Sequence, residues 1–417
     1  MGRETVKADL SREVFGCNRC GFCMAGCPVY RVTGREWDAA RGRVALLRLW
    51  VDGHLSLDEL HETISTCLLC LGCLPHCPAG VRLDRVITLA RQGRLEAGRR
   101  SWWQQVMFRG LLTSPHLLRW AGRVAPLMTG AGRRLLSIGA ARRLLSGLAR
   151  GIQLLPPRLG PAARSALLKR RTSSPQFYYF LGCASDLVFP GVVRATVRLL
   201  EQLGFQVVLS PRQVCCGLPA WAFGDLEAAR RQALANMRAL SELDIPVLSD
   251  CSSCTSTLRH YPDLWPQGTP ERARAEAFAS RVLELVSFLH QFRDRFRGSG
   301  SRKGAVTYHD PCHLSRYLQV REEPRALLRQ LGGWEFREAA EADACCGGAG
   351  SYAVTQPDLS DRILERKIDA LLRTGADVVA TVCPACLMQL GYGLRRRGAR
   401  MRAVHLVELL TRAATFP

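Results

Sequence analysis

The sequence predicts a small helical domain followed by an α/β half that is built from two tandem repeats. Three observations support this prediction. One cysteine phrase occurs twice within residues 17–78, a second and wider cysteine pattern recurs after residue 176, and short β-rich runs precede the cysteines of that second pattern. At 417 residues the chain is long enough for two to four domains with buried cores.

The first phrase is Cys-x-x-Cys-x-x-Cys-x-x-x-Cys-Pro, and it occupies residues 17–28 and 67–78. Three cysteines at this spacing on a tight loop can reach three irons of a cubane, and in two-cluster ferredoxins the fourth cysteine ligates the other cluster. We therefore predict two 4Fe-4S clusters. The predicted ligands are Cys17, Cys20, Cys23 and Cys77 for one cluster, and Cys67, Cys70, Cys73 and Cys27 for the other.

A pair of zinc sites is the alternative, because tetrahedral sites of four cysteines also use Cys-x-x-Cys pairs. Zinc does not require a third cysteine three residues further on, nor a Cys-Pro after it in both copies. The spacing therefore favours iron and sulfide over zinc.

The segments around the two phrases have helical patterns. Residues 34–53 carry apolar side chains along one side and end at a glycine, and residues 57–66 begin after Ser56 with Glu59 three positions on, which is a capping-box pattern. Residues 82–97 continue as a helix after the second phrase. We therefore expect residues 1–97 to form a helical ferredoxin-like domain.

Residues 98–175 are predicted to be a basic amphipathic helical connector. Between positions 97 and 185 there is no Asp or Glu, whereas the same stretch holds fifteen Arg and Lys, including Arg133, Arg134, Arg142 and Arg143. Basic residues that alternate with apolar ones at helical intervals suit helices on an anionic lipid surface or against an acidic partner. The alternative is a linker whose arginines cover its own core. Nucleic acid is a weaker interpretation, because no recognition motif accompanies the charge.

After residue 176 the chain repeats itself. The repeated pattern is a single cysteine, then Cys-Cys-Gly (CCG), then Cys-x-x-Cys, at offsets of 129, 130 and 132 residues. The cysteines are Cys183, Cys215, Cys216, Cys251 and Cys254 in the first repeat, and Cys312, Cys345, Cys346, Cys383 and Cys386 in the second. We expect residues 176–300 and 301–417 to be two α/β cysteine-rich CCG domains.

The β-rich runs indicate where these cysteines lie in each repeat. Residues 177–181 and 305–309 precede the single cysteine, and residues 245–249 and 378–381 precede the Cys-x-x-Cys. The cysteines are thus expected just beyond the carboxyl ends of strands, which is the edge where loops of an open α/β sheet converge on a ligand.

Five thiolates exceed what a tetrahedral zinc or an ordinary cubane uses. A non-cubane 4Fe-4S cluster, opened or bridged by the extra thiolate, would use all five. One structural zinc with a spare thiol is the alternative, and a disulfide in the adjacent pair ranks last because it is strained. His309 and His313 flank Cys312 and could tune the site by hydrogen bonding, although such histidines are more often satisfied neighbours.

Patterns that the sequence lacks limit the functions that the chain can have. The sequence has no apolar run long enough to span a membrane and no signal-peptide pattern, and free thiols suit a reducing compartment. We therefore expect a cytoplasmic protein that can attach peripherally to the inner face of the cell membrane. Nucleophile elbow, phosphate loop and dinucleotide fingerprint are all missing. We therefore predict no catalytic residues in this chain, and a flavin-bearing partner that supplies the substrate chemistry.

Three features carry a resemblance to a known family: the two phrases, the paired repeats and the segment Glu36-Trp-Asp-Ala-Ala-Arg-Gly-Arg43. Together they resemble the iron-sulfur subunit of bacterial glycolate oxidase, nearly from end to end. The most telling local match is Cys345-Cys-Gly-Gly-Ala-Gly-Ser-Tyr-Ala-Val-Thr-Gln-Pro-Asp358, followed by Arg366-Lys367 and Cys383-Pro-Ala-Cys386. The resemblance implies a complex with two flavin-binding subunits that oxidise glycolate, and often lactate, to the 2-oxo acid. It also implies electron transfer to a quinone or another membrane acceptor, with the eight cysteines of residues 17–77 as cluster ligands.

Several alternatives stay open. The repeats are also similar to those of anaerobic glycerol-3-phosphate dehydrogenase and of heterodisulfide reductases, and this chain keeps all ten repeat cysteines, whereas glycolate-type members can lack some from one repeat. The redox alternatives are the iron-sulfur subunit of anaerobic glycerol-3-phosphate dehydrogenase or of a lactate dehydrogenase, or a heterodisulfide-reductase-type catalytic subunit. A zinc scaffold that binds acidic partners is the non-redox alternative. Tyr352 and the run Gln356-Pro-Asp358 favour the glycolate interpretation.

Overall fold

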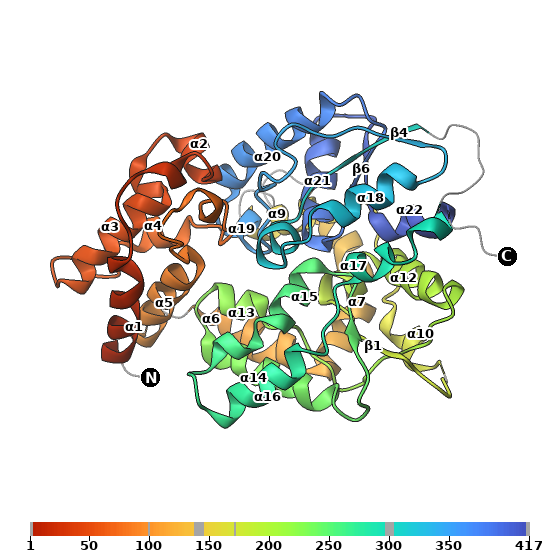
Figure 1. Ribbon diagram of the computed structural model, residues 1–417, viewed down its shortest axis with the longest axis horizontal. Coiled ribbons are helices and arrows are strands. Elements are labelled where there is room, and N and C mark those ends of the chain that lie inside the picture. The colour runs from red at the N-terminus through yellow and green to blue at the C-terminus, as the bar shows by residue number, and fades with distance from the viewer. Residues whose placement is uncertain (1–2, 99–100, 137–145, 171, 297–303, 414–417) are drawn as a thin grey trace.

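The structure is a computed structural model that describes residues 3–98, 101–136, 146–170, 172–296 and 304–413. The N-terminal domain, in red and orange, lies on one side of the molecule in Figure 1, and the two repeats, in green and blue, lie beside it one above the other. The helices of the connector run behind and between the repeats (Figure 1). The connector therefore borders the repeats over much of its length.

The N-terminal domain is helical throughout its described residues. Its longer helices are α1 (Arg3–Phe15), α3 (Ala40–Val51) and α5 (Leu83–Glu96), and α1 packs on both of the others. The shorter elements are α2 (Pro28–Thr33), α4 (His61–Ser65) and the 3-10 turns η1 (Phe22–Met24), η2 (Glu36–Asp38) and η3 (Leu74–His76). Leu47, Ile64 and Val86 are among the apolar side chains that fill the core between these helices.

Two of the expected helices are shorter than predicted. The helix expected over residues 34–53 begins at Ala40, because Glu36–Asp38 forms a 3-10 turn before it. The capping box is present, with the Ser56 amide donating to Glu59 Oε2 at 2.7 Å, yet it closes a turn, and helix α4 starts only at His61. The third helix matches its prediction to within a residue at each end.

The described part of the connector contains one long helix and several short ones that dock on the repeats. They are α6 (Trp102–Gln104), the π-helical turn η4 (Gln105–Gly110), η5 (Leu111–Thr113), α7 (Pro115–Leu136), α9 (Ser146–Leu154) and α10 (Arg164–Leu168). Phe108, Leu112 and Leu118 are buried in the core of the first repeat. Among the described helices, none combines the length and the apolar character needed to cross a bilayer.

Four of the connector's arginines are paired with carboxylates of the repeats. Arg109 binds Asp225 through two nitrogens, each at 3.0 Å, and also Glu227. The other three pairs are Arg150 with Asp361, Arg164 with Asp186, and Arg170 with Glu201. Part of the basic charge is therefore paired with acidic side chains of the repeats, which neither interpretation of the connector specified. Arg142 and Arg143 lie outside the described residues, as do the side chains of Arg133 and Arg134.

Each repeat is built on a parallel sheet. The first has the strand order β2-β1-β3, made of β1 (Phe177–Tyr179), β2 (Val207–Val208) and β3 (Val247–Leu248). The second has the order β5-β4-β6-β7, made of β4 (Gly304–Tyr308), β5 (Trp334–Phe336), β6 (Val378–Thr381) and β7 (Arg402–His405). A single parallel bridge from Val247 to Val282 takes the place of β7 in the first repeat. The α/β prediction and the positions of the strands before the cysteines are therefore confirmed.

Helices cover these sheets. The first repeat contributes α11 (Cys183–Leu187), α12 (Pro190–Gln202), α13 (Leu218–Ala222), α14 (Leu226–Ala239), α15 (Ser252–Arg259), η6 (Tyr261–Leu264), α16 (Pro270–Ala279), α17 (Leu285–His290) and η7 (Arg293–Phe296). The second contributes η8 (His313–Tyr317), α18 (Glu322–Gln330), α19 (Tyr352–Thr355), α20 (Pro357–Leu372), α21 (Pro384–Arg396) and α22 (Leu406–Ala413). The helices α12, α18 and α22 each have one strongly apolar side that faces the core, as expected for helices packed on a sheet.

The two repeats exchange their last helices. The final helix of the second repeat, α22, packs on α12 of the first, and Thr411 Oγ1 donates to the Ala195 carbonyl at 3.2 Å. The corresponding helix of the first repeat, α17, packs on α18 of the second. One hydrophobic core therefore contains residues from both repeats, such as Val192 and Leu328. The boundary at residue 300 divides the repeated sequence but does not divide the core.

Candidate metal centres

The first cysteine group lies on the outer side of the N-terminal domain. Its loop turns through left-handed backbone at Arg19 and Gly21, which lets three thiols of one short segment face a common point. The thiol of Cys23 lies near those of Cys17, Cys77 and Cys20, and burial together with these neighbours raises its pKa. The Cys77 sulfur also accepts a hydrogen bond from the Val81 amide at 3.4 Å. Cys20 is exposed, so this group borders solvent.

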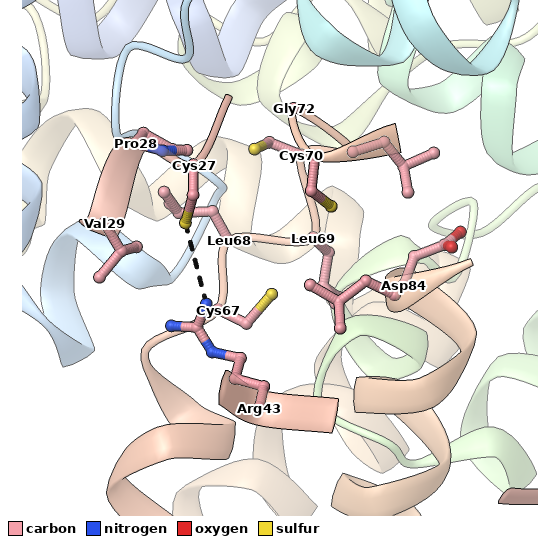
Figure 2. A pocket seen from close by; sticks show the side chains of 13 residues that line it. Cys27, Pro28, Val29, Arg43, Cys67, Leu68, Leu69, Cys70, Gly72 and Asp84 are labelled. Atoms are coloured by element: carbon pink, nitrogen blue, oxygen red, sulfur yellow. Dashed lines mark hydrogen bonds between the residues drawn. The ribbon is translucent and has the colours of Figure 1, made fainter. Parts of the chain in front are cut away.

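The second cysteine group is buried inside the molecule. Its loop uses left-handed backbone at Leu69 and Leu71, and it lines a pocket with the sulfurs of Cys27, Cys67, Cys70 and Cys73. Figure 2 shows the side chains of Cys27, Cys67 and Cys70 around this pocket. Burial raises the pKa of Cys27, and the pKa of Cys73 is raised well above its usual value. The four cysteines are thus grouped across the two phrases, with the last cysteine of the first phrase beside the second loop.

The two loops meet back to back through glycines. A Cβ atom at Gly26 would lie 2.0 Å from the carbonyl oxygen of Gly72, and one at Gly72 would lie 2.4 Å from the carbonyl oxygen of Gly26. No side chain fits at either position without moving backbone. The spacing between the two cysteine groups is therefore fixed by the absence of two side chains.

A buried arginine accompanies the second group. Arg43 is 1% exposed, and its Nη1 lies 4.0 Å from the Cys27 sulfur, the contact that is drawn dashed in Figure 2. Its other nitrogens donate to the Thr63 carbonyl at 2.9 Å and to Thr66 Oγ1 at 3.0 Å. Arg91 donates to the Cys67 carbonyl at 2.7 Å. These cations offset the negative charge that several thiolates would carry in a buried site.

The second group abuts the second repeat. The Cys70 thiol lies within hydrogen-bonding reach of Cys345, and that contact together with burial raises the pKa of Cys70 well above its usual value. Arg316 and Tyr317 of η8 donate to the carbonyls of Cys70 and Leu69, at 3.1 and 2.8 Å. Tyr352 donates to the Thr66 carbonyl at 3.1 Å. The buried cysteine loop of the N-terminal domain is therefore held directly against the cysteines of the second repeat.

In the first repeat the five cysteines converge at the carboxyl ends of β1 and β3. The sulfurs of Cys183 and Cys215 are 4.0 Å apart, and Cys216 contacts Cys254 of the Cys-x-x-Cys. The connector closes this site, because the Cys215 amide donates to the Leu112 carbonyl at 3.2 Å. The predicted convergence of the distant cysteines is confirmed for this repeat.

The second repeat brings its cysteines together in the same way. Cys312 contacts Cys345, and Cys346 contacts Cys386. A ring nitrogen of His309 also lies within 4.8 Å of the sulfurs of Cys346 and Cys386. Burial, followed by the nearby Lys367, lowers the pKa of His309 to about 3, so its imidazole is neutral at physiological pH.

The Cys-x-x-Cys segments of the two repeats touch each other. The thiols of Cys251 and Cys383 are close enough to shift each other's pKa, and Ser253 Oγ lies 3.2 Å from the Cys383 sulfur. The Ser252 amide donates to the Val382 carbonyl at 3.1 Å, which joins the two loops through their backbones. The two five-cysteine groups, which the sequence indicated as one separate site per repeat, therefore border each other.

One cysteine of the CCG run has the same pKa shift in both repeats. Hydrogen bonds from Cys215 and Cys254 hold the pKa of Cys216 well below its usual value, and those from Cys345 and Cys386 do the same for Cys346. In both repeats the second cysteine of the CCG run therefore carries a negative charge more readily than an ordinary thiol does. A thiolate is the form of cysteine that binds metals.

The residues fit the iron-sulfur groups that their spacing indicates. The N-terminal groups each offer four thiols from short loops, an amide already donates to the Cys77 sulfur, and the buried group has cations beside it, as an anionic cluster requires. All eighteen cysteines lie within the described residues, and none forms a disulfide. The thiol chemistry suits soft metal ions throughout. Which sulfurs bind metal stays a prediction.

Sequence reasoning missed three features of these centres. The contact between Cys70 and Cys345 joins positions 275 residues apart, and no local pattern reports it. Arg43 belongs to a segment that stood out in the sequence, but its burial depends on the cluster loops folding over it. His313 is a satisfied neighbour, stacked on Tyr317 and bonded to Ser256 Oγ at 3.2 Å, whereas His309 is not.

Comparisons with known proteins agree with this arrangement. Residues 13–81 match the family described as a 4Fe-4S dicluster domain, and residues 177–259 and 306–391 each match the family described as a cysteine-rich domain. The chain is 31% identical to a "Probable glycolate oxidase iron-sulfur subunit" of Bacillus subtilis (strain 168), over 96% of this chain and 94% of that protein. It is 32% identical to a "Lactate utilization protein A" of Exiguobacterium sp., over 57% of this chain and 97% of that protein, and 33% identical to one of Macrococcus caseolyticus.

Proposed function

The chain belongs to the family of glycolate oxidase iron-sulfur subunits, and from this premise we propose that it is the electron-transfer subunit of a flavin-dependent complex that oxidises a 2-hydroxy acid. Glycolate is the first candidate substrate and lactate the second, because these are the compounds in the names of its relatives. The substrate chemistry takes place on partner flavin subunits, and a quinone or another membrane acceptor receives the electrons.

The observation that carries the proposal is the continuity of the cysteine groups. The exposed group around Cys20 is followed by the buried group around Cys70, which borders Cys345 of the second repeat, and Cys383 borders Cys251 of the first. Iron-sulfur clusters in such positions would supply one-electron carriers in a row. The protein's own contribution is to hold the neighbouring groups next to one another and to bury most of the cysteines beyond the first group.

The buried cations support the same function. Arg43 and Arg91 stabilise negative charge at the second group, and Arg316 is placed between that group and the second repeat. Positive charge near a cluster favours its reduced form, because reduction adds one negative charge. These arginines therefore help to keep an electron inside the molecule between donor and acceptor.

The first test is made on the complex purified without oxygen together with its flavin subunits. We expect a brown protein with on the order of eight irons per chain from two cubanes, and more if the repeats also carry iron. Glycolate or lactate should bleach its visible absorption, and a dye acceptor should restore it. A colourless protein that contains zinc and no iron would contradict the proposal, and thiol-dependent turnover without flavin subunits would favour the disulfide-reductase alternative.

We also propose that the complex attaches peripherally to an anionic membrane through the start of the connector. Trp102, Val106 and Trp120 are exposed there, at 77%, 57% and 62%, and Arg119 and Arg123 lie on the same stretch of chain. Tryptophan favours the interface between lipid headgroups and acyl chains, and arginine is attracted to anionic headgroups. The apolar and basic side chains would thus act together.

This proposal predicts that the complex floats with vesicles that contain anionic lipid, and that binding falls as salt is raised. Replacing both Trp102 and Trp120 by serine should reduce the bound fraction several-fold, since each loses its interfacial contact. Replacing Trp103, which packs on Phe223 inside the molecule with ring centroids 5.5 Å apart, is not a suitable control for the surface. Leu243→Ser, an exposed apolar residue of the first repeat, is suitable and should leave binding unchanged.

A further inference from the structure

His309 is a buried histidine whose ring is not hydrogen-bonded to any residue that the structure describes. It directly follows strand β4, is 1% exposed, and neither of its ring nitrogens has a partner among the residues that the structure describes. Burying a polar group without a partner is unfavourable, so a fully buried imidazole with two free nitrogens requires an explanation.

The other histidines near the repeats show what a satisfied neighbour looks like. His313 is bonded to Ser256 Oγ and stacked on Tyr317 with ring centroids 4.5 Å apart. His405 is completely buried, and its Nε2 is bonded to the Asp250 carbonyl at 2.9 Å. His309 differs from both, because two thiol sulfurs lie close to its ring. A ring nitrogen lies within 4.8 Å of the Cys346 and Cys386 sulfurs, which are within 4.8 Å of each other.

The first repeat has no counterpart of this histidine. With the offset of 129 residues that relates Cys183 to Cys312, His309 corresponds to Phe180, which likewise follows its strand directly. Phe180 is completely buried in the apolar cluster that contains Cys215, Cys216 and Cys254. The two repeats therefore place a phenyl ring and an imidazole at the same position beside otherwise similar sets of five cysteines.

We propose that His309 is a ligand of the metal centre of the second repeat, where it binds together with Cys346 and Cys386. This inference rests on the proposed function, in which the repeats carry metal. It makes the two repeats chemically different: the first is a site of thiolates alone, and the second is a mixed site of thiolates and one imidazole.

The mixed site has a consequence for the direction of electron flow. A neutral imidazole contributes no negative charge, and replacement of cysteine by histidine at an iron raises the reduction potential of a cluster. The buried cation of Lys367 is held nearby by the carbonyls of Glu341 and Ala342, at 2.8 and 2.7 Å, and acts in the same sense. The second repeat is also the one that borders Cys70. It therefore accepts electrons more readily than the first repeat and passes them to or from the N-terminal groups.

The test uses the full-length complex labelled with 15N-histidine and purified without oxygen. Pulsed electron paramagnetic resonance should detect a strongly coupled histidine nitrogen on one centre of the wild-type protein. His309→Phe, which copies the first repeat, should abolish this coupling. His313→Gln removes a histidine next to a predicted cysteine ligand and should leave the coupling intact.

A third variant distinguishes a ligand from a merely structural residue. His309→Cys should keep the metal content of the wild type, lose the nitrogen coupling and shift the midpoint potential of that centre downward, because a thiolate replaces the imidazole. If the second repeat holds zinc, X-ray absorption at the zinc edge should show a nitrogen ligand that His309→Phe removes.

Three results would overturn the inference. The first is a metal-loaded second repeat without a strongly coupled or directly bound nitrogen, and the second is an unchanged coupling in His309→Phe. Each of these leaves the proposed function intact. The third is a protein whose repeats hold no metal although the two N-terminal clusters are present. A protein without any iron would instead refute the proposed function itself.

Discussion

Replacing Cys70 by serine is expected to abolish electron transfer from the hydroxy acid to an external acceptor while the partner's flavin is still reduced. Cys70 is a predicted ligand of the buried cluster and also borders Cys345, so one substitution removes a ligand at the junction of two centres. Even outer-shell partners of a metal site can cost up to about 100-fold in affinity or activity, so loss of a ligand should reduce acceptor turnover at least as much. The measurement is acceptor reduction in the steady state, with flavin absorption followed in the same sample.

Ser65→Ala is the matched control for this variant. Ser65 lies at the same junction, where its hydroxyl accepts a hydrogen bond from the Gln356 amide at 3.4 Å, and its removal affects no sulfur. This variant should keep its iron and its turnover. If Cys70→Ser also prevented reduction of the flavin, the chain would take part in the substrate chemistry, and its assignment as a relay would be wrong.

Replacing Gly26 by alanine is expected to release iron from both N-terminal groups. The added Cβ would lie 2.0 Å from the Gly72 carbonyl oxygen and 2.6 Å from the His76 ring, so the two cysteine loops must separate. Overpacking of this kind costs roughly 1–3 kcal/mol, and a backbone contact belongs at the upper end of that range. Because each predicted cluster takes ligands from both phrases, separation of the loops affects both. Iron analysis and visible absorption of the purified chain measure the loss.

Gly16→Ala provides the comparison for this prediction. Gly16 directly precedes Cys17 in the same loop, and an added Cβ would meet only the Glu13 carbonyl oxygen, at an ordinary 3.6 Å. We expect full iron content in this variant. Equal iron in Gly26→Ala and in the wild type would show that the loops can move apart without losing their ligands.

The local geometry could be predicted from the sequence, because cysteine spacing is itself a geometric constraint. The regular spacing indicated the loops, and the recurrence after residue 176 indicated the parallel sheets with cysteines at their carboxyl ends. The α/β half and the helical character of residues 3–98 are confirmed for the residues that the structure describes. Helix starts were less accurate, because the capping box at Ser56 closes a turn and not a helix.

Long-range contacts could not be predicted in the same way. The basic stretch without acidic residues suggested a surface, yet Arg109 and Arg150 are paired with Asp225 and Asp361 of the repeats. Nothing in the local pattern specifies those partners, which lie more than one hundred positions away. The same holds for His309, because whether a histidine is satisfied depends on side chains that only the folded chain brings to it.

The exchange of α17 and α22 makes the C-terminus of this chain a structural support for residues some two hundred positions upstream, since Thr411 is bonded to Ala195. A chain that ended before Leu406 would leave the apolar side of α12 uncovered, although α12 belongs to the other repeat. The duplicated half therefore cannot be cut at its midpoint into two working copies. Damage to either end should make both copies unfold as a single cooperative unit.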